Sequence, residues 1–218
     1  MEKASNHRMS QNRMVQKEKE VVLREVFSMF KNHGIVPIKM DDIANRLSMS
    51  KRTLYEMFEN KESLILECII AHNKRNKILL EVEGDYEYNI LKQAFDFLHL
   101  VMMEFKSSNY RFYEDLKKYP KVLAYIEQVH NENRIKGKKW FKKGVKQGLF
   151  RDDINIELIT NTVFYLSQSL SHRKVMNEYS IKTLLSSIYM VILRGIATSK
   201  GLSILYIYEK KYFTNEEI

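Results

Sequence analysis

The sequence predicts an all-α protein. Pro occurs twice and Gly seven times in 218 residues, and strand-rich folds need many more of these turn-forming residues. Apolar residues make up 44% of the chain, enough for a sizeable core, and they recur at helical spacing along most of its length. Long helices joined by few breaks are therefore expected, first in a small N-terminal domain and then in a larger helical region.

The first predicted helix follows a polar segment. Residues 1–16 are polar and show no periodicity, so we expect them to be disordered. From Lys17 onward, apolar residues form a stripe typical of an amphipathic helix. The stripe contains Val22, Val26, Met29 and Phe30. The helix should end near Gly34, which suits the left-handed cap position, and Pro37 supports a break there.

The stretch "DDIANRLSMSKRTLYEMFENKESL", residues 41–64, predicts two short helices separated by a tight turn. Asp41 and Asp42 open the first helix, where carboxylates meet the positive end of the helix dipole. Ser48-Met49-Ser50 forms the turn, and Ser50 is a suitable N-cap for a second helix that reaches about residue 58. This arrangement is the helix-turn-helix pattern. Asn60 then caps a further helix that ends near Leu80.

The rest of the chain predicts more helices. Glu83-Gly84-Asp85 interrupts the periodicity and marks the expected boundary between regions. Five helices are expected after it, at about 87–106, 109–118, 121–147, 155–173 and 181–198. The tail "LSILYIYEKKYF", residues 202–213, is compatible with helix or strand, and we favour helix.

The net charge of +9 is unevenly distributed. Residues 1–68 have a net charge of only +2, whereas residues 134–148 contain seven cations and no acidic residue. One interpretation of this basic run is a solvated helix face with Trp140 turned inward. The alternative is a secondary contact with DNA, an anionic ligand or a membrane surface.

Several kinds of site are not expected. Cys68 is the single cysteine, which excludes an intramolecular disulfide and a thiolate metal cluster. The six histidines (7, 33, 72, 99, 130 and 172) are scattered, so no metal site is expected. Phosphate-binding glycine loops and serine nucleophile motifs are missing, and we expect no cofactor, no catalytic residue and no enzyme activity. The N-terminus has no apolar run and no segment is suitable for a membrane span, which favours the cytoplasm.

The second short helix carries side chains suited to DNA. Lys51 and Arg52 can donate to guanine O6 and N7 in the major groove. The hydroxyls of Thr53 and Tyr55 can donate to phosphate oxygens, which position a helix without reading sequence. Lys39 and Lys61 precede or begin helices and can meet the phosphate backbone together with the helix amides. The alternative is that this short polar face is only solvated.

Residues 17–68 resemble the N-terminal DNA-binding domain of the TetR family of bacterial transcriptional regulators. The resemblance rests on Ile-Ala, a turn, Ser-Lys-x-Thr-Leu-Tyr-x-x-Phe and Lys-x-x-Leu within "MDDIANRLSMSKRTLYEMFENKESL". It implies that Thr53, Tyr55 and Lys61 contact phosphates. It also implies that Ser50, Lys51, Arg52 and Glu56 face the groove.

Two positions depart from the family pattern. Ile38 stands where Thr is usual, which puts one phosphate contact in doubt. Ser48 stands where Gly is common, and Ser would be modestly strained there if the turn requires a positive φ.

The resemblance further implies a homodimer and an effector pocket in the C-terminal helices. Candidate dimer residues are Ile159, Val163, Leu166, Leu170, Leu185, Ile188 and Ile192. Candidate pocket residues are Phe95, His99, Met102, Met103, Tyr110, Tyr113, Phe164 and Gln168. The alternative for both sets is ordinary burial in the monomer. An apolar or aromatic effector is the default expectation.

The expected function is that of a ligand-responsive transcriptional regulator, a repressor, which binds palindromic operator DNA as a homodimer. The expected organisation is a disordered extension (1–16), a DNA-binding domain (17–68) and an effector-binding and dimerisation domain (69–218). Two alternatives remain. One is an architectural DNA-binding protein without small-molecule input, and the other is a helical interaction module with a coincidental helix-turn-helix.

Overall fold

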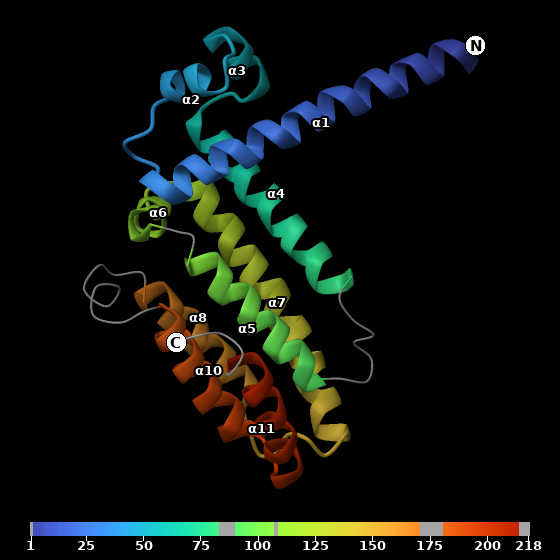
Figure 1. Ribbon diagram of the computed structural model, residues 1–218, viewed down its shortest axis with the longest axis vertical. Helices are drawn as coiled ribbons and strands as arrows, with labels where there is room; N and C mark the ends of the chain where they lie inside the picture. Colours follow the sequence, from blue (N-terminus) through green and yellow to red (C-terminus); the bar gives the residue numbers. More distant parts are fainter. Residues whose placement is uncertain (1, 83–89, 107–108, 171–180, 214–218) are drawn as a thin grey trace. The chain divides into compact units, whose positions relative to one another are not determined.

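The computed structural model describes residues 2–82, 90–106, 109–170 and 181–213, and helices form nearly all of this part (Figure 1). The described residues contain ten α-helices and no β-strand, with one isolated bridge between Phe150 and Ala197. The predicted all-α fold is confirmed. None of the described helices has both the length and the apolar character that crossing a bilayer requires.

The chain divides into two compact units. Unit 1 consists of Met1–Ile78 and Arg111–Tyr125, and unit 2 consists of Leu79–Tyr110 and Ile126–Ile218. Residues 111–125, which the sequence analysis assigned to the C-terminal domain, therefore cluster with the N-terminal helices. The expected boundary at Glu83-Gly84-Asp85 lies outside the described residues.

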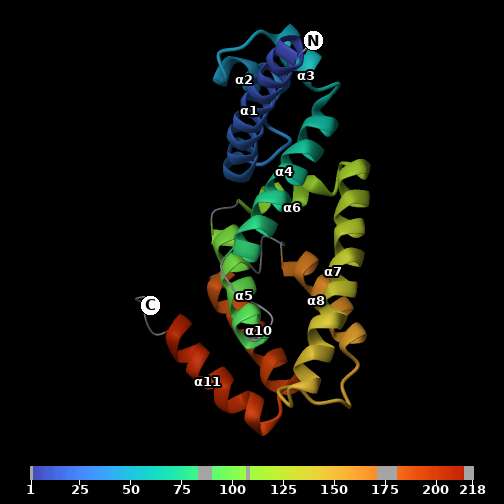
Figure 2. The same cartoon turned by 90° about the vertical axis from the view of Figure 1, so that its right-hand side faces the viewer.

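Unit 1 contains short and long helices in the predicted order. They are α1 (Glu2–His33), α2 (Met40–Arg46), α3 (Lys51–Met57), α4 (Lys61–Val82) and α6 (Tyr110–Leu116). Gly34 ends α1 as predicted, since it has a φ of +83° and its N–H donates to Phe30 O at 2.9 Å. Helices α2 and α3 pack against each other as a pair (Figure 2).

Helix α1 begins earlier than expected. Residues 2–16 were predicted to be disordered, but they continue the same helix from Glu2. Their composition explains the difference, because Glu, Lys, Ala, Arg, Gln and Met are good helix formers and neither Gly nor Pro occurs before Gly34. The lack of an apolar stripe therefore did not exclude a helix.

The core of unit 1 uses the apolar faces that the sequence predicted. Its fully or nearly fully buried members include Val26, Phe30, Ile43, Ala44, Leu54, Phe58, Leu64, Ile65 and Cys68. Each large side chain buried in this way stabilises the fold by roughly 1.5–3 kcal/mol. Phe27 stacks on His72 at 4.3 Å and meets Phe112 of α6 edge-on at 5.6 Å between ring centroids. The Cys68 thiol is enclosed here and donates to Leu23 O at 3.5 Å.

Unit 2 is built from long helices. They are α5 (Ile90–Lys106), α7 (Pro120–Lys146), α8 (Ile156–Leu170), α10 (Ile181–Ile196) and α11 (Ser199–Phe213), and the first turns of α7 belong to unit 1. Helix α5 packs against α10 and α11. The tail at residues 202–213 is helical, which confirms the favoured interpretation.

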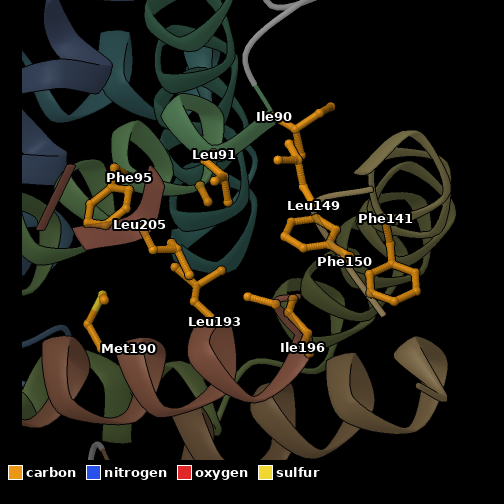
Figure 3. Close-up of a cluster of buried hydrophobic side chains, with 12 residues drawn as sticks. Ile90, Leu91, Phe95, Phe141, Leu149, Phe150, Met190, Leu193, Ile196 and Leu205 are labelled. Atoms are coloured by element: carbon orange, nitrogen blue, oxygen red, sulfur yellow. The ribbon is translucent and has the colours of Figure 1, made fainter. Parts of the chain in front are cut away.

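The core of unit 2 gathers side chains from several of these helices (Figure 3). Figure 3 shows Leu193 and Ile196 of α10 directed toward the same interior as Leu91 and Phe95 of α5. Helix α7 joins this core where Gly144 lies beneath Phe150: an added Cβ would be 2.1 Å from Phe150 Cδ2. A side chain at position 144 would therefore displace the Phe150 ring.

The basic run at 134–148 lies mostly on α7. Trp140 is turned inward, where its indole N–H donates to Ile90 O at 3.1 Å and its ring lies 4.9 Å from that of Phe150. Several lysines of the same run are exposed, namely Lys136, Lys139, Lys142, Lys143 and Lys146. This arrangement is the solvated helix face of the first interpretation. A contact of that face with a polyanion stays a prediction.

Candidate nucleic-acid interface

The helix-turn-helix begins at Lys39 and turns at Ser48. Lys39 is the extended residue before α2, and its N–H donates to Asp42 Oδ2 at 2.7 Å. After α2, Met49 N donates to Ala44 O at 3.0 Å, which closes the turn. Ser48 has a φ of +53°, so this turn does require a positive φ at a position where Gly is common. The turn therefore carries the modest strain of a side chain in the left-handed region.

Ser50 caps α3, as predicted. Its Oγ accepts from Thr53 N at 3.0 Å and shares a hydrogen bond with Thr53 Oγ1 at 2.8 Å. The two hydroxyls that were candidates for DNA contacts thus bond to each other in the free protein. Both residues remain exposed, so either hydroxyl can still accept or donate to an outside group.

The two cations of α3 are paired with carboxylates of the same domain. Lys51 Nζ lies 2.5 Å from Asp41 Oδ2, which links α3 to α2. Arg52 Nε donates to Glu56 Oε1 at 2.8 Å along the exposed face of α3. Because both pairs are largely exposed, each contributes about 1 kcal/mol or less to stability. Phosphates can therefore displace these carboxylates at low cost.

Tyr55 is the one aromatic residue of α3. Its side chain is 50% exposed, while the neighbouring Leu54 is fully buried. Its hydroxyl makes no hydrogen bond to any other described residue. It is therefore available for a phosphate oxygen.

Lys61 points inward rather than toward solvent. Its Nζ donates to Ile35 O at 2.7 Å, in the segment before α2. Burial lowers the pKa of Lys61, and the nearby carboxylates of Asp115 and Asp42 oppose that change. The phosphate contact that the resemblance implies for Lys61 would require this bond to break.

The residues predicted to line an effector pocket are distributed over both units. Phe95 is buried in the core of unit 2, with Tyr208 and Tyr212 beside its ring at 5.6 and 5.3 Å. Met102 is buried, Tyr110 is partly buried, and His99 and Met103 are exposed. Tyr113 belongs to unit 1.

The other two candidates are on α8. The Phe164 ring stacks on His130 at 3.6 Å, and the Gln168 side chain lies outside the described part. A shallow hollow of about 110 Å³ in unit 2 contains none of the eight predicted residues. Its lining consists of Arg134, Ile135, Lys138, Ile156, Glu157 and Thr160. The pocket stays a prediction.

Four of the seven predicted dimer residues on α8 and α10 have described side chains, and all four are partly buried. Ile159 and Ile192 pack against the core of unit 2, and Val163 and Ile188 are partly buried. The side chains of Leu166, Leu170 and Leu185 lie outside the described part.

The exposed apolar residues of these helices are different ones, namely Leu158 (64% exposed), Tyr165 (66%) and Val191 (70%). Each of them lies one position from a predicted dimer residue, and the interface stays a prediction. The helices are apolar on more than one side, and the pattern alone did not say which side faces the core.

Comparison with known proteins identifies the N-terminal region. Residues 23–68 match the family model described as bacterial regulatory proteins, tetR family. Curated protein sequences give no significant match.

Solved structures extend the likeness to most of the chain. A TetR-family transcriptional regulator from Marinobacter aquaeolei is 20% identical with a TM-score of 0.69, covering 89% of this chain and 98% of that one. A transcriptional regulator from Saccharomonospora viridis, solved with choline, is 15% identical with a TM-score of 0.65, covering 84% and 99%. The fatty acid degradation regulator FadR from Bacillus halodurans is 14% identical with a TM-score of 0.63, covering 80% and 94%.

These identities are low, and the structural likeness therefore concerns the fold. The fold matches over nearly the whole length of those regulators, and the family model covers the helix-turn-helix itself. Residues 23–68 therefore resemble the bacterial regulatory proteins of the tetR family, and the chain shares the fold of solved regulators of that family.

Proposed function

We propose that this protein is a ligand-responsive transcriptional repressor that binds palindromic operator DNA as a homodimer. Helix α3 is the recognition helix in this proposal, and its N-terminal half enters the major groove. The observation that carries the proposal is the exposed face of α3, where Lys51, Arg52, Thr53 and Tyr55 all reach solvent beside a capped N-terminus.

The charge pairs on this face suit reversible binding. The carboxylates of Asp41 and Glu56 hold Lys51 and Arg52 in place without burying them. On DNA, phosphate or guanine acceptors replace the carboxylates, and counterions are released from the duplex. In this proposal Lys39 and Tyr55 contact phosphates on either side of the groove.

Dimerisation is proposed through the outer faces of α8 and α10. Leu158 and Tyr165 are seven residues apart, two turns along one side of α8, and Val191 lies on the exposed side of α10. A contiguous apolar surface formed by these side chains would be typical of one covered by a partner. A two-fold axis would bring the same face of a second copy against it and would present two copies of α3 to two half-sites.

The effector is proposed to act by population shift. It must bind one arrangement of the dimer more tightly than the arrangement that fits the operator. The Saccharomonospora viridis regulator, which is similar in fold, was solved with choline, and a small organic molecule bound in unit 2 is proposed here by analogy. The chemical class of the effector stays open, with an apolar or aromatic compound as the default expectation.

The test is a binding assay with DNA from immediately upstream of the gene, compared with a scrambled duplex at two salt concentrations. A preference of about a thousandfold that persists at physiological salt supports a specific operator binder. Equal and weak binding to both duplexes that collapses with salt would indicate phosphate attraction alone. A Tyr55→Phe variant should bind the preferred duplex more weakly, and an unaltered affinity would count against α3 as the recognition helix.

A further inference from the structure

The segment 34–39, which connects α1 to α2, is held by a residue far away in the sequence. Ile35 is fully buried within this connector, so its backbone groups need partners. The N–H groups of Ile35 and Val36 both donate to Asp115 Oδ2 at 2.8 Å. Asp115 lies on α6, 80 residues after Ile35. We name this pair of bonds the Asp115 clasp.

The Asp115 carboxylate is buried yet charged. Its residue is only 6% exposed, and burial alone would raise its pKa. The hydrogen bonds from Val36 N, Lys118 Nζ and Ile35 N outweigh burial and hold the pKa of Asp115 below its ordinary value. The clasp is thus a pair of charge-assisted hydrogen bonds, the stronger kind.

Lys61 binds the connector from its other side. While the N–H of Ile35 donates to Asp115, the carbonyl oxygen of Ile35 accepts from Lys61 Nζ at 2.7 Å. Both polar groups of one residue are therefore bonded to buried or half-buried charges of opposite sign. This double contact restrains the peptide planes on both sides of Ile35.

Three further contacts place α6 and the start of α7 against the same region of unit 1. Phe112 meets Phe27 edge-on at 5.6 Å. Lys121 N donates to Glu62 Oε1 at 2.9 Å, so α4 caps the N-terminus of α7. A Cβ on Gly34 would lie 3.0 Å from Arg111 Cβ and 3.1 Å from Asp115 Oδ2, which shows how closely α6 approaches the connector.

We propose that Asp115 is a positioning residue for DNA binding, which acts by fixing the connector that leads into α2. The connector ends at Lys39, so its conformation sets where α2 starts and where the Lys39 side chain emerges. Asp115 lies outside residues 23–68, the part that matches the family model. The inference rests on the proposed function, because it assigns a role in the DNA binding proposed above.

A companion assignment follows for Lys61. Lys61 also holds the connector in place, through its bond to the carbonyl oxygen of Ile35. It therefore contributes to DNA binding by fixing the connector, without touching a phosphate. The two roles differ in a measurable way, because removing a cation that touches a phosphate lowers the salt slope of binding by about 0.9.

The experiment uses the full chain and a duplex recovered by the wild-type protein from a random-sequence pool. Asp115→Asn keeps the shape of the side chain but loses the charge and one acceptor oxygen. Amide exchange of Ile35 and Val36, followed by NMR without DNA, should become about tenfold faster or more. Affinity for the selected duplex should fall about tenfold or more, with an unchanged salt slope.

The matched control is Asp153→Asn, the same chemical change at an exposed carboxylate of unit 2 that pairs with Arg151. It should alter neither the two amides nor DNA affinity. Faster amide exchange in Asp115→Asn with wild-type DNA affinity would overturn the positioning role. Unchanged exchange would overturn the clasp itself.

Lys61→Met tests the proposal independently. It is needed if circular dichroism shows that Asp115→Asn does not fold. Weaker binding with a wild-type salt slope supports the structural role, and a slope lower by about 0.9 overturns it. Lys39→Gln should show that lower slope and serves as the positive control. If the wild-type protein recovers no duplex from the pool, the proposed function fails, and the amide exchange result still decides whether the clasp exists.

Discussion

Lys51 Nζ lies 2.5 Å from Asp41 Oδ2, and this contact joins the second helix of the helix-turn-helix to the first. The pair is exposed, so the carboxylate competes with any phosphate or base for the same ammonium group. Asp41→Asn should therefore strengthen DNA binding about two- to fivefold at low salt, with the gain fading as salt rises. Fluorescence anisotropy over a salt series measures this, with Asp153→Asn as the control. Weaker DNA binding by Asp41→Asn would mean that Asp41 contributes more by stabilising α2 than it costs by competing for the ammonium group of Lys51.

Ser50 caps α3 through the bond from Thr53 N at 3.0 Å. Ser50→Ala leaves that amide without its partner and should lower the free energy of unfolding by about 1 kcal/mol, as measured by urea denaturation. Ser50→Asp keeps a capping oxygen and should keep the stability. The same variant should bind DNA more weakly than wild type, because the added carboxylate would face phosphates. Equal losses of stability in both variants would contradict the cap.

Gly34 and Gly148 both have positive φ, +83° and +69°. A Cβ at Gly34 meets Arg111 Cβ at 3.0 Å, whereas a Cβ at Gly148 meets nothing within 4 Å. Gly148→Ala should therefore cost about 1 kcal/mol through backbone strain alone, and Gly34→Ala should cost more because α6 must also move. Thermal unfolding of the two variants gives the comparison. Equal losses of stability in the two variants would mean that α6 can move away from the connector without a cost in free energy.

Acid should weaken unit 1 through Asp115. Its pKa in the folded protein lies below the ordinary value, so the unfolded chain takes up the proton first as pH falls. The stability from the ionised carboxylate is complete above the unfolded-chain pKa of about 4 and is lost as pH drops through the lower folded-state pKa. Between pH 5 and pH 3, about one unit on either side of that pKa, urea unfolding measures the free energy of unfolding. This free energy should decline less steeply for Asp115→Asn than for wild type. A parallel decline would contradict this assignment.

The outer faces of α8 and α10 offer a test of the dimer. Val191 and Ile207 are exposed to similar extents, 70% and 65%. Val191→Glu should convert a dimer to a monomer in sedimentation, because burying an unpaired carboxylate in an apolar interface costs several kcal/mol. Ile207→Glu on α11 adds the same charge outside the proposed interface and should leave the assembly unchanged. Dissociation by Ile207→Glu alone would move the interface to α11.

Local features of unit 1 were predictable because their causes are local. The end of α1 at Gly34, the positive φ of Ser48 and the cap at Ser50 each follow from one residue type in one short segment. The Asp115 clasp was not predictable, since nothing in the sequence around Asp115 indicates that its partners lie 80 residues earlier.

The faces of α8 could not be distinguished for a related reason. Leu158 and Ile159 are adjacent and both apolar. Only the packing of α8 on the rest of unit 2 decides that Ile159 faces the core and that Leu158 stays exposed. A periodic pattern gives the width of an apolar surface, and its orientation depends on the helices that cover it.

The enclosure of Cys68 has a practical consequence for experiments on this protein. The thiol is fully buried, and burial strongly raises its pKa, so thiolate chemistry at this position is suppressed. Since the sequence contains no other cysteine, a thiol introduced at an exposed position such as Glu56 can be alkylated selectively on the otherwise native chain. Spin labels attached there would report the spacing of two α3 helices in an assembled protein, with and without candidate effectors.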